Sequence, residues 1–307
     1  YMNILFAGSP KSSSEILDFL AKDPSLRIKG VLTQPDKKGK RGTKLHESEV
    51  ARIAREHNLN IFKPKTLDCP NFVGEIKNLD IDLVIVIAYG KLIPKWLLEL
   101  PALMVLNVHF SILPKYRGAS PIQSSILNGD KETGISFMQM NEGLDEGGVL
   151  KTNTIKIDKG DNKITLEKKL TDLTIDNIFD VIKLIKNRTF SILNQNNSMA
   201  TYCRKILKKD SITDFNDFSI NIINKFRAYF DWPGLSFEFK GVQIKIHKIS
   251  ISQEASNGKA GSINKIDKSG IYINTMDSVI VITYLQFPNK NKISSLDVFN
   301  SYQSFFK

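Results

Sequence analysis

The sequence has few of the residues that build metal centres and disulfide frameworks. It contains two cysteines, Cys69 and Cys203, and four histidines among 307 residues. The cysteines lack metal-ligand spacing, and no two histidines lie four positions apart as they do in a zinc-binding helix. We therefore expect no metal and no disulfide, and we expect a reducing compartment, the cytoplasm.

Long apolar runs are also missing, so we expect no membrane-spanning helix and no membrane partner. The chain opens with an apolar strand over residues 3–8, followed by the turn Gly8-Ser9-Pro10-Lys11. This order is typical of the first turn of a nucleotide-binding-like βαβ unit. The second and third glycines of the Gly-x-Gly-x-x-Gly fingerprint are absent, and their absence disfavours a dinucleotide cofactor.

Negative charge is in deficit. The 43 Lys and Arg outnumber the 32 Asp and Glu, which gives a formal net charge of +11 and a sequence pI of about 9.4. Such a balance favours a polyanionic partner, above all nucleic acid. The chain is also rich in Lys, Ile and Asn, so compositional drift is the alternative explanation.

The apolar segments of the first half predict an α/β fold. Buried strands at residues 28–33, 82–88 and 103–109 alternate with helical segments such as 47–58 and 166–185. Continuous apolar strands of this kind are typical of a parallel sheet covered on both faces. We therefore expect a Rossmann-like α/β domain over residues 1–188.

The pattern changes after a polar, Asn-rich segment, which we interpret as a linker over residues 189–206. Short alternating strands then follow at regular spacing. They lie at 235–239, 242–249, 261–266, 270–274 and 278–285. We expect a small β-barrel domain over residues 207–307.

The segment from residue 107 to residue 145 carries the chemistry. Asn107 and His109 follow an apolar strand, and alternation along an extended chain sends both side chains to the same side. Asp145 lies in a Gly-flanked loop that can fold back toward them. These three residue types, with no candidate Ser or Cys nucleophile, indicate acid–base and oxyanion chemistry on a bound carbonyl.

The same residues carry a resemblance to a known family. Asn-x-His at 107–109, Ser-Ile-Leu-Pro-Lys-Tyr-Arg-Gly at 111–118 and Gly-Leu-Asp at 143–145 together resemble the folate-dependent formyltransferases. The resemblance implies transfer of a formyl group from 10-formyltetrahydrofolate to an amine, and an OB-like second domain. It implies that Asn107 stabilises the oxyanion, His109 protonates the departing folate nitrogen, and Asp145 orients His109 and helps to remove the amine proton.

The resemblance also implies a folate site built from two segments. One is the turn after the strand at 82–88, and the other is the loop after His109. The implied residues are Ala88, Tyr89, Gly90, Leu92, Ser111, Ile112, Leu113 and Pro114. Two departures from the family pattern are Phe110, where a small residue or Pro is usual, and Gly148, where many relatives carry Asp.

A basic loop helps to distinguish among the possible acceptors of the formyl group. Residues 34–44 resemble the Gln-Pro-Asp…Arg-Gly-x-Lys-Leu insertion of the branch that formylates methionine on initiator tRNA. We therefore expect a protein that binds initiator methionyl-tRNA for translation initiation. We also expect a monomer. The expected tRNA contacts are Lys37, Lys38, Lys40, Arg41 and Lys44. The alternatives are a formyltransferase with a small-molecule or sugar-nucleotide acceptor, and a tRNA-binding protein with an inactive enzyme domain.

Overall fold

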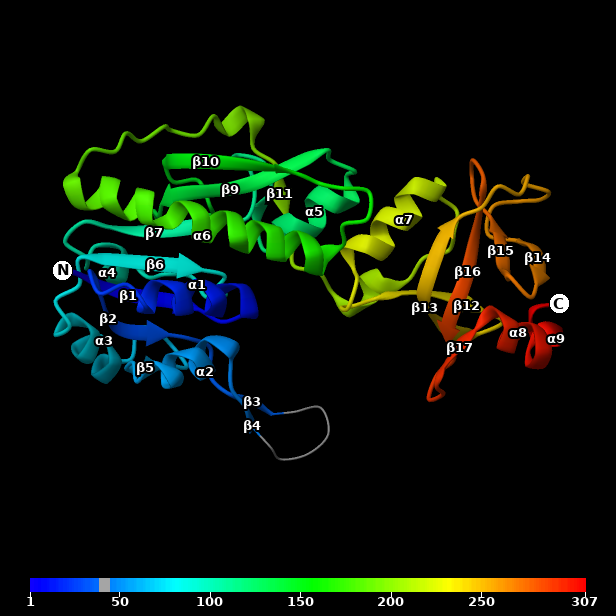
Figure 1. The fold of residues 1–307 in the computed structure, drawn as a ribbon, viewed down its shortest axis with the longest axis horizontal. Coiled ribbons are helices and arrows are strands. Elements are labelled where there is room, and N and C mark those ends of the chain that lie inside the picture. Colours follow the sequence, from blue (N-terminus) through cyan, green and yellow to red (C-terminus); the bar gives the residue numbers. More distant parts are fainter. Residues whose placement is uncertain (39–44) are drawn as a thin grey trace. The chain divides into compact units, whose positions relative to one another are not determined.

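The computed structural model describes residues 1–38 and 45–307, which form two compact units (Figure 1). The first unit holds residues 1–121, 132–156 and 167–204, and the second holds 122–131, 157–166 and 205–307. Within these described ranges, no helix combines the length and hydropathy needed to cross a membrane.

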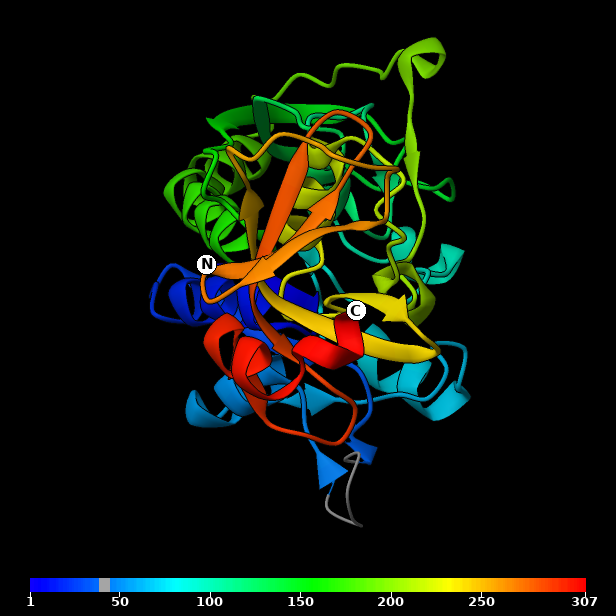
Figure 2. The same cartoon turned by 90° about the vertical axis from the view of Figure 1, so that its right-hand side faces the viewer.

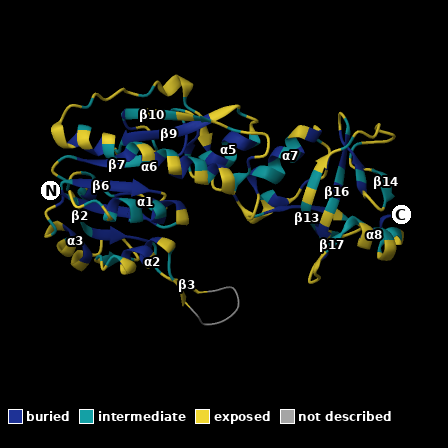
Figure 3. Ribbon diagram, viewed as in Figure 1, coloured by how far each residue is buried: buried dark blue, intermediate teal, exposed yellow. Residues whose placement is uncertain are grey.

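The first unit is built on a seven-stranded sheet in the order β10-β9-β7-β6-β1-β2-β5. Its strands are β1 (Met2–Gly8), β2 (Leu26–Leu32), β5 (Ile61–Phe62), β6 (Leu83–Ile87), β7 (Met104–His109), β9 (Glu132–Gln139) and β10 (Val149–Lys156). The parallel strands of this sheet are β1, β2, β5, β6 and β7, whereas β9 is antiparallel to both β7 and β10. All five residues of β6 are buried, as expected for a strand covered on both faces (Figure 3).

Six α-helices within the described residues precede the second domain in the chain, and one of them, α5, lies mostly in the second unit. They are α1 (Lys11–Ala21), α2 (Glu49–Glu56), α3 (Pro70–Lys77), α4 (Lys95–Leu98), α5 (Pro121–Leu127) and α6 (Lys163–Asn187). Helix α2 shows why such a segment folds: Ser48 caps its N-terminus by accepting a hydrogen bond from the amide of Ala51. Val50 and Ile53 lie on its buried face, so packing adds to the cap.

The register of the sheet places two chain segments at one edge. Val86 of β6 pairs with Asn107 of β7, so the turn after β6 begins beside His109. Because the carboxyl ends of neighbouring parallel strands meet at one edge, ligands bind there in open α/β sheets.

The second unit is built on a six-stranded antiparallel sheet, which faces the viewer in Figure 2. Its strands are β12 (Leu235–Phe239), β13 (Val242–Ile251), β14 (Ile263–Asp267), β15 (Gly270–Asn274), β16 (Val279–Gln286) and β17 (Lys292–Ser294). Its helices are α7 (Ser219–Ala228), α8 (Ser295–Ser301) and α9 (Gln303–Phe306). Ile222, Val298 and Phe306 bring these helices into the apolar core of the sheet.

The expected fold class is confirmed: a parallel-rich α/β sheet is followed by a separate antiparallel β domain. The expected strands of the second domain are present to within a few residues. The expectations omitted β17, α8, α9 and the short helices α3 and α4.

Candidate active site

Strand β7 presents Asn107 and His109 at the ligand-binding edge of the sheet. The His109 ring is buried, and its Nε2 lies 2.8 Å from the carbonyl oxygen of Tyr116. A carbonyl oxygen only accepts hydrogen bonds, so Nε2 carries a proton and donates it. In the neutral ring the other nitrogen, Nδ1, is therefore the one without a hydrogen.

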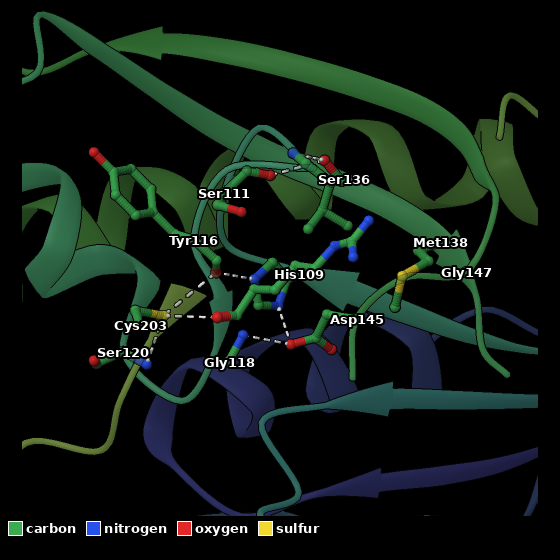
Figure 4. Close-up of polar contacts among 12 residues, drawn as sticks. His109, Ser111, Tyr116, Gly118, Ser120, Ser136, Met138, Asp145, Gly147 and Cys203 are labelled. Atoms are coloured by element: carbon green, nitrogen blue, oxygen red, sulfur yellow. Dashed lines mark hydrogen bonds and ion pairs between the residues drawn. The ribbon is translucent and has the colours of Figure 1, made fainter. Parts of the chain in front are cut away.

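Asp145 is the group that faces this nitrogen. Its Oδ2 lies 3.7 Å from Nδ1 of His109 and accepts a hydrogen bond of 2.8 Å from the amide of Gly118 (Figure 4). A separation of 3.7 Å is too long for a direct hydrogen bond, so the two groups are close neighbours that are not hydrogen-bonded to each other in this structure. The structure thus brings together His109 and Asp145, two of the three expected chemical groups.

Asn107 lies two residues before His109 on the same strand, with its side chain on the same side. Its Oδ1 atom is buried and has no hydrogen-bond partner within residues 1–38 and 45–307. Buried polar atoms are nearly always paired, so this oxygen is an uncommon acceptor that could take a hydrogen bond from a bound molecule.

The loop after β7 is held by internal hydrogen bonds. Ser111 is fully buried, and its hydroxyl donates to the carbonyl of Lys115 at 2.6 Å. The Ser136 hydroxyl donates to the carbonyl of Ser111 at 2.8 Å and accepts from the amide of Leu113 at 3.1 Å. Leu113 itself packs in a small apolar cluster. The hydroxyl of Ser111 and the side chain of Leu113 therefore support the loop, while Ile112 and Pro114 remain partly exposed.

The turn after β6 offers mainly backbone and one apolar side chain. Ala88 and Gly90 are exposed and have positive φ angles of 47° and 79°. The side chain of Leu92 is 84% exposed. Tyr89 points the other way into the core, where burial raises the pKa of its hydroxyl to about 12. Lys91 braces the turn by donating to the carbonyls of residues 64 and 65, and burial lowers its pKa.

A segment far along the chain completes the site. Strand β11 (Tyr202–Cys203) pairs with β8 (Arg117–Gly118) beside the Tyr116 carbonyl. A Cβ atom on Gly118 would lie 2.3 Å from the carbonyl oxygen of Cys203, so this close approach requires glycine. The sulfur of Cys203 contacts the carbonyls of Tyr116 and Arg117 at 3.4 Å. Cys203 is therefore part of the packing behind His109.

Arg117 is a buried cation in the segment that follows the loop. It is 1% exposed, and its guanidinium bonds to Gln195, Asn197 and Tyr202. In this structure Arg117 therefore holds neighbouring parts of the chain together and does not face solvent. Gln195 escaped detection because a polar, Asn-rich stretch is also the usual signature of a solvated linker.

The structure shows what surrounds Gly148 and Phe110, the two residues that depart from the family pattern. A Cβ on Gly148 would lie 2.0 Å from Cγ2 of Ile192, so the Ile192 side chain occupies the room that a larger residue would need. Phe110 is 8% exposed, and alternation along the chain turns it away from His109.

The basic loop is described only in part. Lys37 and Lys38 are exposed on β3 (Lys37–Lys38), which pairs with β4 (Leu45–His46). The expected contacts Lys40, Arg41 and Lys44 lie outside the described residues. Across the part of the chain that the structure describes, no three His, Cys, Asp or Glu side chains are grouped to hold a metal.

Comparisons with known proteins identify relatives of this chain. A family model described as formyl transferase matches residues 2–182, and one described as its C-terminal domain matches residues 205–303. The methionyl-tRNA formyltransferase of Caldicellulosiruptor saccharolyticus is 37% identical over 98% of this chain and 97% of its own length. That of Finegoldia magna is 40% identical over 97% of this chain and 96% of its own length.

A solved structure shares the fold. The sugar 3N-formyl transferase WlaRD, determined in the presence of dTDP and 5-N-formyl-THF, superposes with a TM-score of 0.69 at 21% identity. The match covers 94% of this chain and 99% of WlaRD. The family expected from the residues is thus confirmed: the chain belongs to the formyl transferase family, and its curated relatives over nearly its whole length are methionyl-tRNA formyltransferases.

Proposed function

We propose that the protein transfers the formyl group of 10-formyltetrahydrofolate to the amino group of methionine on initiator tRNA. The observation that carries the proposal is the approach of Asp145 to Nδ1 of His109 at the edge of the sheet that also presents Asn107. These are groups that suit acyl transfer to an amine: an oxyanion donor, a proton carrier and a neighbouring carboxylate that can take up a proton.

The reaction is a transfer without a covalent enzyme intermediate. The amine lone pair attacks the formyl carbon, and the formyl oxygen becomes an oxyanion that the amide of Asn107 stabilises. The amine loses a proton toward Asp145, and His109 delivers a proton from Nδ1 to N10 of the folate. The bond between carbon and N10 then breaks, which yields the formylated amine and tetrahydrofolate.

The folate is proposed to lie between the turn at 88–92 and the loop at 111–114. A flat pterin needs apolar surface together with a few backbone hydrogen-bonding groups. The exposed backbone of Ala88 and Gly90 and the exposed side chain of Leu92 have this character. Ile112 and Pro114 supply partly exposed apolar surface on the second segment.

The acceptor assignment is supported by the curated relatives at 37% and 40% identity, whose names include methionyl-tRNA. It is also supported by the excess of positive charge and by the exposed pair Lys37 and Lys38. We propose that the basic loop contacts the acceptor end of the tRNA, and that residues 207–307 bind the tRNA backbone without sequence preference. Exposed lysines such as Lys240, Lys248 and Lys292 suit such binding.

The test is formyl transfer from labelled 10-formyltetrahydrofolate to two acceptors in parallel, charged initiator methionyl-tRNA and a dTDP-linked amino sugar. We expect rapid labelling of the methionyl-tRNA and background labelling of the sugar. Preferential labelling of the sugar would contradict the proposed acceptor, and labelling of neither would contradict the proposed reaction.

A further inference from the structure

The side chain of Gln195 links a buried cation to the loop that carries Asp145. Its Oε1 atom accepts hydrogen bonds from Nε and Nη2 of Arg117 at 3.0 and 2.9 Å. Its Nε2 atom donates to the carbonyl oxygens of Asp145 and Gly147 at 2.8 and 2.7 Å. The amide therefore uses both acceptor positions and both donor hydrogens.

The chemistry of the neighbours fixes how this amide is oriented. A guanidinium offers only donors, whereas a backbone carbonyl only accepts. Turning the amide over would set donors against donors and oxygens against oxygens. Arg117 thus acts as an anchor that keeps the N–H groups of Gln195 directed at the Asp145 loop.

Asp145 needs such support because its backbone is strained. Its φ angle is +49°, in the left-handed region that residues other than glycine seldom adopt. Two contacts hold it there: the amide of Gly118 bonds its carboxylate, and Gln195 bonds its carbonyl. If the second contact is lost, the backbone can relax toward negative φ and turn the carboxylate away from His109.

We propose that Gln195 is a positioning residue for formyl transfer, which holds the Asp145 backbone so that the carboxylate faces His109. The inference rests on the proposed function, since it concerns the reaction in which Asp145 acts. The segment after α6 then belongs to the active site, although it carries none of the three reacting groups.

Two substitutions of Gln195 test this link between Arg117 and the Asp145 loop. Gln195→Glu keeps the shape and still accepts from Arg117, but it sets oxygen against the carbonyls of Asp145 and Gly147. Gln195→Asn keeps the amide but is one methylene too short to reach both partners. Asn197→Ala is the matched control, because it removes another Arg117 hydrogen bond of 2.8 Å and leaves the Asp145 loop untouched.

We expect both Gln195 variants to lower kcat by about 10–100-fold, the scale of misplacing a reacting group by a fraction of an ångström to one ångström. The KM values for tRNA and folate should stay within about threefold, and Asn197→Ala should remain near the wild-type rate. Because Gln195 acts through Asp145, adding Gln195→Glu to Asp145→Asn should cause no further loss. A kcat near that of wild type, or losses that multiply fully in the double variant, would overturn the proposal.

Hydrogen–deuterium exchange of the peptide 140–148 gives a readout that needs no substrate. We expect faster exchange in both Gln195 variants than in wild type and in Asn197→Ala. Equal exchange in all four proteins would overturn the proposal. A wild-type protein that formylates no methionyl-tRNA would contradict the proposed function instead, and the exchange rates would still decide whether Gln195 holds Asp145.

Discussion

Nδ1 of His109 faces Oδ2 of Asp145 across 3.7 Å, while the opposite ring nitrogen is fixed on the carbonyl of Tyr116. The proposed proton transfer by His109 therefore takes place at the nitrogen that faces the carboxylate. The role proposed for each group can be tested by changing a single side chain.

Asn107→Ala should lower kcat by about 10²–10³-fold, because an amide placed for an oxyanion acts mainly in the transition state. The KM for methionyl-tRNA should change little. Steady-state kinetics with both substrates varied will measure this. A variant that raises KM and keeps kcat would show that Asn107 binds the ground state and has no special role in transfer.

Tyr89→Phe should stabilise the protein by about 1 kcal/mol at neutral pH, because the buried Tyr89 hydroxyl has no partner within the described residues. The folded-state pKa of Tyr89 is raised to about 12 from its ordinary value of 10.0. The unfolded chain therefore loses the proton first, and wild-type stability should fall as pH rises above about 10.

Urea unfolding at pH 7 and at pH 10.5 will measure both effects. The variant should be more stable than wild type at both pH values, and by a larger margin at the higher one. A destabilised variant at neutral pH would mean that the hydroxyl has a hydrogen-bond partner, such as a buried water.

Gly147→Ala should disturb the Asp145 loop more than Gly148→Ala. The added Cβ at 147 would lie 1.8 Å from the backbone oxygen of Gln139, which cannot move alone. At 148 it would meet the end of the exposed Ile192 side chain, which can rotate. We expect a loss of about 1–3 kcal/mol and a lower kcat for the first variant. Thermal unfolding and kcat measurements on both variants will test this expectation. Equal effects of the two substitutions would contradict the difference in packing at positions 147 and 148.

Replacing Lys40, Arg41 and Lys44 by Ala should raise the KM for tRNA and flatten its salt dependence, by up to about 0.9 in the log–log slope per phosphate contact removed. Folate binding should not change. Replacing exposed Lys77 on α3 controls for general loss of charge. An unchanged salt slope in the triple variant would contradict the proposed contact of these residues with tRNA.

The sequence predicted the parts of the molecule in which one physical signal dominates. Buried strands such as β6 are apolar throughout, and the spacing of Asn107 and His109 on one strand fixes their common side. Local patterns could not predict contacts formed by polar groups far apart in the chain. Gln195 reaches Arg117 and Asp145 through hydrogen bonds alone, and its neighbours Asn194 and Asn196 look like solvated coil.

The sequence also could not predict the direction in which side chains point within a turn. The segment 88–92 was correctly placed at the end of β6, but periodicity does not tell that Tyr89 points into the core while Leu92 points out. Positive φ angles at Ala88 and Gly90 break the alternation of an extended chain, and the family resemblance that implied these residues carries no information on where each side chain points.

Single-turnover formylation of charged initiator methionyl-tRNA by wild type and by Asp145→Asn tests the central claim most directly. The amide keeps the size of the carboxylate but removes its charge and its ability to take up a proton. We predict transfer by wild type and a rate about 10²–10⁴-fold lower in the variant, with the Kd values for tRNA and folate unchanged. Equal rates in the two proteins would contradict the claim that Asp145 and His109 act together in formyl transfer.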